Sequence, residues 1–448
     1  MWKSRTTVRD HAKFVVGAVI ALCSVCVGAN AAAITTQDFR LTRESEVALE
    51  IQARSPGASW ARKGAEASAL KIEVDGQYNQ DLLLAVGDVP FVYRVVLGRF
   101  PSGKHRVTVR LNEARSAVGA QQATVLSLKA VPLNRDSHHS NDDLLALAYS
   151  PILYQRTNTI DRFSDLPILM YYEVSHPSQA EVLVRYTTIF TNEDGGTPTA
   201  ALMARWGRAA DIEWVYELRV RGGQVVEENY QGVNHETKPF RGERMNGNHP
   251  LLAVASDNNN FSDQISSIVR FALLPIKVDL QSATRESVMD ANPWTYRLVA
   301  EELTREGKIK AKPADGNSIS DPRNYVYVDL YATQLKSAIS VEVVSNKQPG
   351  PARSDLSDNR LRIDRSGYFR TAIRLGSAES AAAVSTVIVY CYSDTGQNCE
   401  NVEVRSVSVL NQDYTPKFFP ITQEQPRTLK ANEMFSIAVK QRSSVKPK

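Results

Sequence analysis

Short stretches of alternating apolar and polar residues, separated by turn-forming residues, recur along most of the chain. Alternation with a period of two is typical of a half-buried β-strand, because successive side chains point to opposite faces of a sheet. Between residues 34 and 131 these stretches are bounded by turns at Asp75–Gly76 and Pro101–Gly103, which predicts a β-sandwich. The strands expected there are Glu46–Ala53, Ala69–Val74, Phe91–Leu97 and His105–Leu111.

The same alternation returns between residues 324 and 448 and predicts a second, C-terminal β-sandwich. A long loop rich in Pro, Gly, Ser and Asp, from Asn346 to Asn359, interrupts it. The strands expected in this sandwich are Tyr325–Leu330, Ile339–Val344, Tyr368–Leu375, Ser385–Tyr392 and Asn401–Val409.

The region between the sandwiches, residues 144–306, has longer strands, expected at Ile168–Val174 and Val182–Phe190. It also contains a helical segment, Trp294–Glu306, for which Asn292 is the expected N-cap and Gly307 the stop signal. This pattern predicts a central α+β domain that is rich in β-structure. The whole chain is therefore expected to be mostly β and multidomain.

Two polar, turn-rich segments, residues 132–143 and 307–323, are predicted to link the three domains. The first contains His138 and His139. Two adjacent side chains in an extended segment point apart, so we interpret this pair as solvated residues of the linker and not as metal ligands.

The first 33 residues do not follow this strand pattern. Four basic residues precede an apolar run from Phe14 to Ala29, which is short for a bilayer span and ends in Ala-x-Ala pairs. This predicts a signal peptide that is cleaved after Ala31 or Ala33, a secreted or periplasmic protein, and no stable membrane span after cleavage. An uncleaved anchor and a lipoprotein are the alternatives, although Cys26 follows Val25, where lipidation favours a small residue.

Composition narrows the classes of partner. A chain of 448 residues that is 43% hydrophobic and 23% charged can bury several cores. Loss of the signal removes four basic residues and Asp10, which lowers the net charge from +4 to about +1. No segment combines clustered Lys and Arg with aromatic residues, so nucleic acid is not an expected partner.

Cysteine usage agrees with export. Cys23 and Cys26 lie in the signal, which leaves Cys391 and Cys399 on either side of a turn-rich hexapeptide. In an oxidising compartment this arrangement predicts a disulfide, with two free thiols as the alternative. A zinc site at these cysteines is not expected, because no histidine follows His249 in the sequence.

One polar strand stands out in the central domain. In the segment from Asp211 to Val220, alternation places Asp211 and Glu213 side by side, roughly 6.5–7 Å apart, where they can share a cation or hold a water molecule. The apolar face of this strand is expected to consist of Ile212, Trp214, Tyr216, Leu218 and Val220, with Val215 as the only interruption of the polar face.

Further candidates for binding or metal ligation lie close by in the sequence. They are Glu193 and Asp194 in an acidic turn, His235, His249, and Asp257 at the start of an Asn-rich loop. Carboxylates and amides suit calcium, and histidines suit zinc or manganese, but no spaced metal motif is present, so a divalent cofactor stays an open hypothesis.

Two structural interpretations compete with a site. Arg205 and Arg208 could neutralise Asp211 and Glu213 as ordinary ion pairs on a solvated face. Isolated histidines are more often hydrogen-bonded structural residues than ligands.

The segment from Trp206 to Trp214, with the flanking segments that end at Tyr154 and Ala255, resembles the G-H-R-H-D-W-E region of necrosis-inducing-like secreted proteins and their vacuolar-sorting-labelled relatives. In that family the acids and the first histidine of the motif line a metal-binding cavity on a β-sandwich. The resemblance spans about residues 149–260. Gly207, Asp211 and Glu213 match the motif, whereas Arg208 and Ala210 replace both histidines, and Ala209 and Ile212 replace the arginine and tryptophan.

Two sandwiches around a larger domain are typical of secreted proteins that handle polysaccharides. We therefore expect a modular protein that binds an extracellular polymer, in particular carbohydrate, or an envelope component. A metal-dependent hydrolase with a carboxylate site and a structural protein of the cell envelope are the alternatives. The question of enzymatic activity stays open, although no G-x-S-x-G elbow, phosphate-binding loop or Cys–His pair is present.

Overall fold

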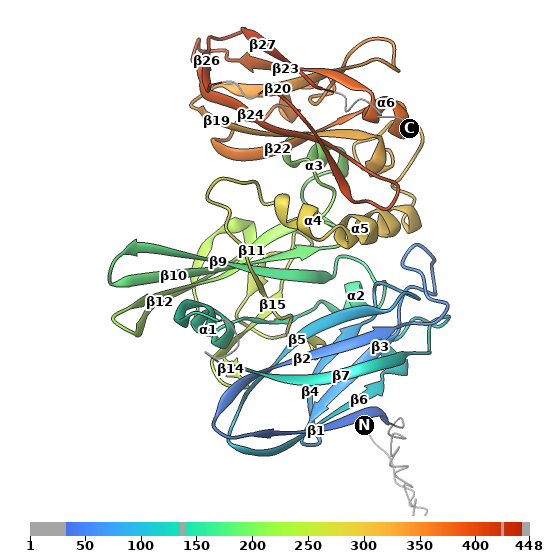
Figure 1. Cartoon of the computed structure of the whole chain (residues 1–448), viewed down its shortest axis with the longest axis vertical. Helices are drawn as coiled ribbons and strands as arrows, with labels where there is room; N and C mark the ends of the chain where they lie inside the picture. The colour runs from blue at the N-terminus through green and yellow to red at the C-terminus, as the bar shows by residue number, and fades with distance from the viewer. Residues whose placement is uncertain (1–32, 135–138, 423–424, 441–448) are drawn as a thin grey trace, which may run out of the picture.

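A computed structural model describes residues 33–134, 139–422 and 425–440. Residues 1–32 of the predicted signal peptide, and His138, therefore lie outside the described residues. The chain is mostly β and forms several domains, as expected from the sequence (Figure 1). Within the described ranges no helix is long and apolar enough to span a membrane.

The N-terminal sandwich consists of two antiparallel sheets, with strand orders β1-β6-β3-β4 and β5-β2-β7. Alternate residues of β2 and β3, among them Leu49, Ile51 and Ile72, are fully buried between the sheets, because a period of two sends every second side chain inward. The strands are β1 (Ala33–Leu41), β2 (Ser45–Arg54), β3 (Ala69–Val74), β4 (Gln77–Leu83), β5 (Phe91–Phe100), β6 (Gly103–Leu111) and β7 (Thr124–Leu133).

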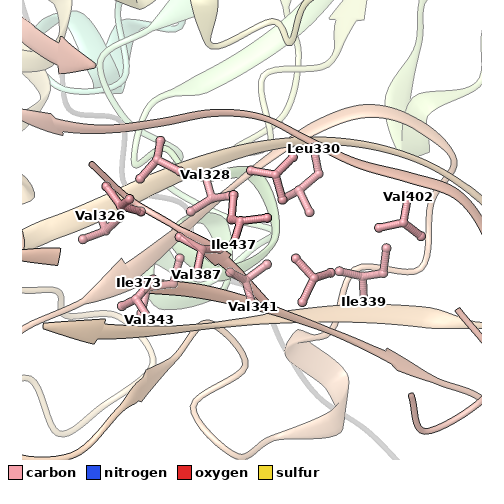
Figure 2. Packing of buried hydrophobic residues seen from close by; sticks show 14 of the residues in the cluster. Val326, Val328, Leu330, Ile339, Val341, Val343, Ile373, Val387, Val402 and Ile437 are labelled. Atoms are coloured by element: carbon pink, nitrogen blue, oxygen red, sulfur yellow. The ribbon is translucent and has the colours of Figure 1, made fainter. Parts of the chain in front are cut away.

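The C-terminal sandwich pairs a sheet of order β22-β19-β24-β25, with β26 also on β24, with a sheet of order β21-β20-β23-β27. Figure 2 shows Val328 and Leu330 of one sheet facing Val341 and Val387 of the other across an apolar core. The elements are β19 (Tyr325–Gln334), β20 (Ala338–Ser345), β21 (Ala352–Arg353), β22 (Gly367–Arg374), α6 (Ala378–Ala382), β23 (Val384–Tyr392), β24 (Cys399–Leu410), β25 (Pro416–Phe419), β26 (Arg427–Leu429) and β27 (Met434–Ala438).

The predicted disulfide is present in this sandwich. Cys391 lies near the end of β23 and Cys399 begins β24, so the bond closes the turn between two strands of opposite sheets. The Cα atoms are 5.9 Å apart, within the range that a disulfide requires. Both cysteines are fully buried in the core.

The central domain is built on a six-stranded sheet of order β13-β12-β11-β10-β9-β18 and a smaller sheet of order β14-β15-β8-β17, with β16 on β15. Helices α3, α4 and α5 lie between the large sheet and the C-terminal sandwich (Figure 1). The elements are α1 (Asn141–Ala148), β8 (Ile152–Tyr154), α2 (Thr157–Ile160), β9 (Pro167–Ser178), β10 (Glu181–Phe190), α3 (Thr199–Trp206), β11 (Asp211–Arg221), β12 (Gln224–Gln231), β13 (Thr237–Pro239), β14 (Arg244–Met245), β15 (His249–Val254), β16 (Phe261–Ser262), β17 (Arg270–Phe271), β18 (Ile276–Lys277), α4 (Ser287–Ala291) and α5 (Trp294–Arg305).

The expectation of one continuous apolar face along β11 is wrong. The register with β10 skips one residue, since Tyr186 pairs with Tyr216 but Thr187 pairs with Trp214. Val215 is the extra residue of a β-bulge. Because of this extra residue, the alternation of side chains between the two faces of the sheet shifts by one position at Val215. Ile212 therefore packs in a different core from Tyr216.

Helix α5 confirms the expected helix, but its N-terminus differs from the prediction. Asn292 closes the short helix α4, and Pro293 occupies the N-cap position of α5. The backbone carbonyl of Asn292 still accepts a hydrogen bond from the Thr295 N–H, 2.9 Å away. The two helices are thus joined by a tight corner.

The two segments predicted as linkers contain ordered structure. Strand β7 continues to Leu133, and α1 begins at Asn141 behind a Ser140 capping box. In the second segment Ile309 bridges to Ile319, whose side chain is buried in the core shared with the C-terminal sandwich. The connections therefore hold neighbouring domains in contact.

Candidate functional site

Three loops of the central domain meet at one end of the large sheet. They follow β10, β12 and β15, and together with the start of β11 they gather three carboxylates and an imidazole. Glu193 and His235 lie in these loops, whereas Asp211 and Glu213 lie on β11. We call this group the His235 cluster. Its members are Glu193, Asp211, Glu213 and His235, with the amides Gln231, Asn258, Asn259 and Asn260.

His235 is the most accessible member, with half of its side chain exposed. Gln231 Nε2 lies 2.6 Å from its Nδ1, and Asn258 Nδ2 lies 3.0 Å from its Nε2. Glu213 Oε2 is 3.7 Å from Nδ1, and this carboxylate raises the pKa of His235 above its ordinary value. The ring is thus held between amides and an acid, with one face open to solvent.

The acids behind His235 are progressively more buried. Burial, together with the charge of Glu213, raises the pKa of Glu193 to about 7, although the Thr197 N–H donates to Glu193. Asp211 is almost completely buried, and burial and the charges of Glu213 and Glu193 raise its pKa well above the ordinary value. Glu193 therefore gives the cluster a carboxyl group that titrates near neutral pH.

The backbone of these loops is unusual. Asn234, His235 and Asn259 have φ values of 62°, 60° and 47°, a region that few residues other than glycine adopt. At Gly196, with φ of 99°, an added Cβ would clash with the side chains of Glu193 and Asn258. Such conformations concentrate where a site requires side chains in fixed positions.

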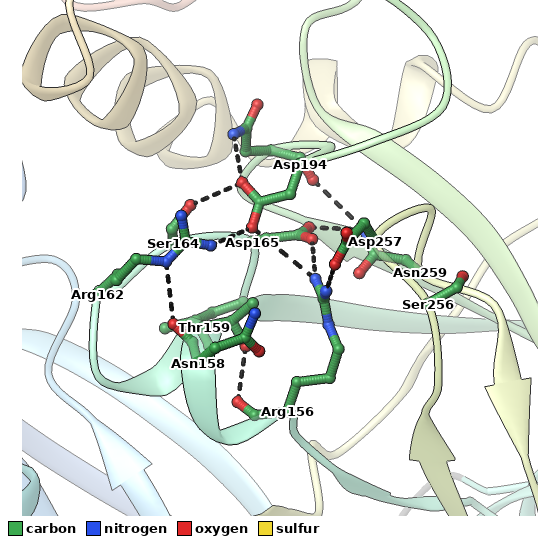
Figure 3. Close-up of polar contacts among 12 residues, drawn as sticks. Arg156, Asn158, Thr159, Arg162, Ser164, Asp165, Asp194, Ser256, Asp257 and Asn259 are labelled. Atoms are coloured by element: carbon green, nitrogen blue, oxygen red, sulfur yellow. Dashed lines mark hydrogen bonds and ion pairs between the residues drawn. The ribbon is translucent and has the colours of Figure 1, made fainter.

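A buried ion network adjoins the cluster and was not predicted from the sequence (Figure 3). Arg156 Nη2 contacts Asp165 at 2.8 Å, and Arg156 also pairs with Asp257 and Asp194. Asn259 Nδ2 donates to Asp165 Oδ1 at 2.6 Å and to Asp211 Oδ2 at 3.0 Å. Asn259 therefore joins this network to the His235 cluster.

No sequence signal could have identified this network, because Arg156 and Asp165 lie in short irregular segments without periodicity. Burial, and then the negative charge of Asp194, raises the pKa of Asp165 well above its ordinary value, against the hydrogen bond from Asn259.

The seven candidate residues thus separate into three groups. Glu193, Asp211, Glu213 and His235 converge in the cluster. Asp194 and Asp257 belong instead to the Arg156 network. His249 lies elsewhere, which corrects its assignment: its buried ring faces the Ser150 carbonyl at 2.8 Å and Glu46 Oε2 of the N-terminal sandwich at 3.2 Å.

The expected neutralisation of Asp211 and Glu213 by two arginines is also wrong. Arg205 pairs with Asp364 at 2.7 Å, and Arg208 pairs with Glu286 at 2.6 Å. Neither arginine forms an ion pair with Asp211 or Glu213 among the described residues, although the positive charge of Arg208 still lowers the pKa of Asp211 and Glu193 against the effect of burial.

The described residues include no group of three or more His, Cys, Asp or Glu side chains arranged to hold a metal ion. Two amide oxygens of the cluster, Gln231 Oε1 and Asn259 Oδ1, are buried and find no hydrogen-bond partner within the described ranges. Carboxylate acceptors, amide donors and an exposed imidazole are nevertheless suited to hydrogen bonding with a polar ligand.

Two hollows lie outside the cluster. A cavity of about 160 Å³ between the N-terminal sandwich and the central domain is lined mainly by apolar side chains, with Phe91 and Trp294 among them. A groove of about 270 Å³ beside β9 and β10 is lined by charged and apolar groups, including Glu173, Arg185 and Asp279.

Comparisons with known proteins add little to this picture. No model of a protein family and no curated protein matches the chain. Among solved structures, a match is found to the tandem CBM51 modules of a family 98 glycoside hydrolase from Streptococcus pneumoniae, at 11% identity over 77% of this chain and 74% of that chain. The TM-score is 0.16, too low to establish a common fold.

Proposed function

We propose that the chain is a secreted or periplasmic binding protein that recognises a hydroxyl-rich ligand, namely carbohydrate of an extracellular polymer, at the His235 cluster. The convergence of Glu193 and His235, from two loops, with Asp211 and Glu213, from the start of β11, supports this proposal. Loops positioned by a rigid sheet are common places for binding residues.

The hydrogen-bond donors and acceptors of the His235 cluster suit a sugar. A carboxylate such as Glu213 accepts hydrogen bonds from ligand hydroxyls, and amides and the imidazole of His235 both donate and accept them. Because His235 is half exposed while Asp211 is buried, ligand hydroxyls would meet His235 and Glu213 first. Asp211 and Asn259 would then position these groups.

The interdomain cavity and the hydrolase alternative have less support. The interdomain cavity is smaller than the roughly 300–1,000 Å³ typical of ligand pockets, and few of its groups can bond hydroxyls. A metal-dependent hydrolase requires ligands gathered around a cation, and the described carboxylates do not form such a group.

A glycan array probed with the mature protein and with Glu213→Gln and His235→Ala variants tests the proposal. Both variants should lose binding to any glycan that the wild type recognises, by about tenfold or more for the loss of one charged hydrogen bond. Glu217→Gln is the matched control, since Glu217 lies on the same strand but pairs with Arg185.

Equal binding by wild type and both variants would place the glycan elsewhere, and an array with no bound glycan would exclude the carbohydrate class tested. N-terminal sequencing of the exported protein tests the location: the chain should begin at Ala32 or Ile34. An intact Met1 would contradict cleavage of the signal.

A further inference from the structure

Three guanidinium groups surround one indole ring where helix α3 meets the C-terminal sandwich. The guanidinium carbons of Arg365, Arg205 and Arg208 lie 5.0, 5.2 and 6.0 Å from the centre of the Trp206 ring. Trp206 ends α3, and Arg365 lies in the loop before β22, so the two sides of this site come from different domains. We call it the Trp206 site.

The positive charges of the Trp206 site are incompletely neutralised. Glu286 pairs with Arg208, and Asp364 pairs with Arg205. Arg365 forms no ion pair with any carboxylate in the described part of the chain; its Nη2 donates to the backbone carbonyl of Arg205. Two carboxylates therefore face three guanidiniums.

Two of these guanidiniums also have unused donors. Arg365 Nη1 and Arg205 Nε are buried and have no hydrogen-bond partner among the residues that the structure describes. Burial, against the attraction of the Glu286 carboxylate and with the positive charges of Arg208 and Arg205, lowers the pKa of Arg365 to about 10. A buried charged donor without a partner is destabilising, so an acceptor group supplied from outside would stabilise this arrangement.

We propose that the Trp206 site binds an oxyanion, a carboxylate, sulfate or phosphate, between Arg365 and Arg205. The planar fork of a guanidinium matches two oxygens of such a group, and two forks beside the same indole ring hold it in a fixed orientation. The anion is either a free ion or an acidic substituent of the polymer.

Asp364 indicates how the anion reaches the site. Its side chain is 62% exposed, and its carboxylate already contacts Arg205 Nη2 at 2.7 Å. This exposed carboxylate occupies a position that an oxyanion can take over by displacing it into solvent. Asp364 is thus a competitor of the ligand, whereas Arg365 is a ligand-binding residue.

The test is thermal unfolding of the mature protein with increasing sodium sulfate, compared with sodium chloride at the same ionic strength. A bound anion raises the melting temperature saturably by mass action, whereas general salting-out by sulfate rises without saturation. Wild type should show the saturable rise, and Arg365→Gln should lose it. Arg405→Gln is the matched control, because Arg405 lies 5.9 Å from the Tyr368 ring and pairs with Glu403.

Two further results distinguish a binding arginine from a structural one. In chloride, Arg365→Gln should melt no lower than wild type, because it removes repulsion among like charges; a structural arginine would melt lower. Asp364→Asn should lower the sulfate concentration at half-maximal effect, because it removes the competitor. If Arg365→Gln does not fold, Arg365→Lys, which keeps the charge but not the fork, should show a weakened rise.

An equal sulfate response in wild type and Arg365→Gln, or no saturable response at all, would overturn the proposal. A uronic-acid oligosaccharide tested beside sulfate identifies the source of the anion. A response to the oligosaccharide at concentrations where sulfate has no effect indicates a substituent of a polymer, and the reverse indicates a free ion.

Discussion

Trp60 of the N-terminal sandwich donates its indole N–H to the buried carboxylate of Glu302 on helix α5, at 3.0 Å across 242 residues of sequence. Glu302 also accepts hydrogen bonds from the Asp165 N–H and the Ser164 hydroxyl. The Glu302 carboxylate therefore connects the N-terminal sandwich to the segment of the central domain that contains Ser164 and Asp165.

Trp60→Phe should lower the free energy of unfolding by about 1–3 kcal/mol, since it leaves a buried carboxylate with one donor fewer. Urea denaturation measures the change. Trp214→Phe is the control, because Trp214 is only partly buried and should change stability by less than about 1 kcal/mol. Equal losses in the two variants would mean that the Trp60 hydrogen bond contributes nothing.

Stability should fall as the pH rises from about 5 to 8. The folded-state pKa of Glu193 is raised to about 7 from an ordinary 4.5, and Glu302 shows the same shift. A carboxyl whose pKa is raised in the folded state stabilises the fold fully below about pH 4.5. This contribution to the free energy of unfolding is lost as the pH rises through about 7.

For Glu193, solvent screening reduces the expected loss to about 2 kcal/mol. Denaturation measured at several pH values checks this, and Glu193→Gln should flatten the curve because the amide does not titrate. Glu379→Gln, at a carboxylate that is 80% exposed, should leave the curve unchanged. A wild-type curve without slope in this range would refute the raised pKa values.

Gly207→Ala should be strongly destabilising. Gly207 ends helix α3 with φ of +65°, and an added Cβ would clash with the buried side chain of Arg370, which pairs with Asp290 and Asp329. Gly307, which follows helix α5 with φ of +70°, has nothing within 4 Å of an added Cβ.

Gly307→Ala thus measures the backbone cost alone, about 1 kcal/mol, and Gly207→Ala should exceed it by roughly 1–3 kcal/mol. Melting temperatures of the two variants make the comparison. Equal shifts would show that Arg370 moves aside without cost.

Replacing both Cys391 and Cys399 by serine should lower stability by roughly 2–3 kcal/mol, because the short loop is no longer closed in the unfolded chain. The fold should persist, since the surrounding strands keep their apolar core. Alkylation of the native protein without reductant, followed by intact-mass analysis, should find no modified thiol at these positions. Two alkylated cysteines would disprove the bond.

Local patterns were sufficient to predict most strands of the two sandwiches, because the period of two is visible within each strand. They were insufficient for β11, where the bulge at Val215 reverses the faces and depends on pairing with β10. The meeting of Glu193, Glu213 and His235 depends on two loops and the start of β11, and was not visible in sequence spacing. His249 failed as a candidate for the same reason: its partner, Glu46, lies in another domain.

Trp294, at the start of α5, packs against three hydrophobic clusters: the core of the first sandwich, the core it shares with the central domain, and the core that contains Tyr325 and Tyr327 of the last sandwich. A side chain that packs against three cores cannot be buried by one domain alone. The three domains are thus poorly suited to being exchanged between proteins as separate units during evolution. An isolated sandwich moved to another protein would expose an apolar surface that only its present neighbours cover.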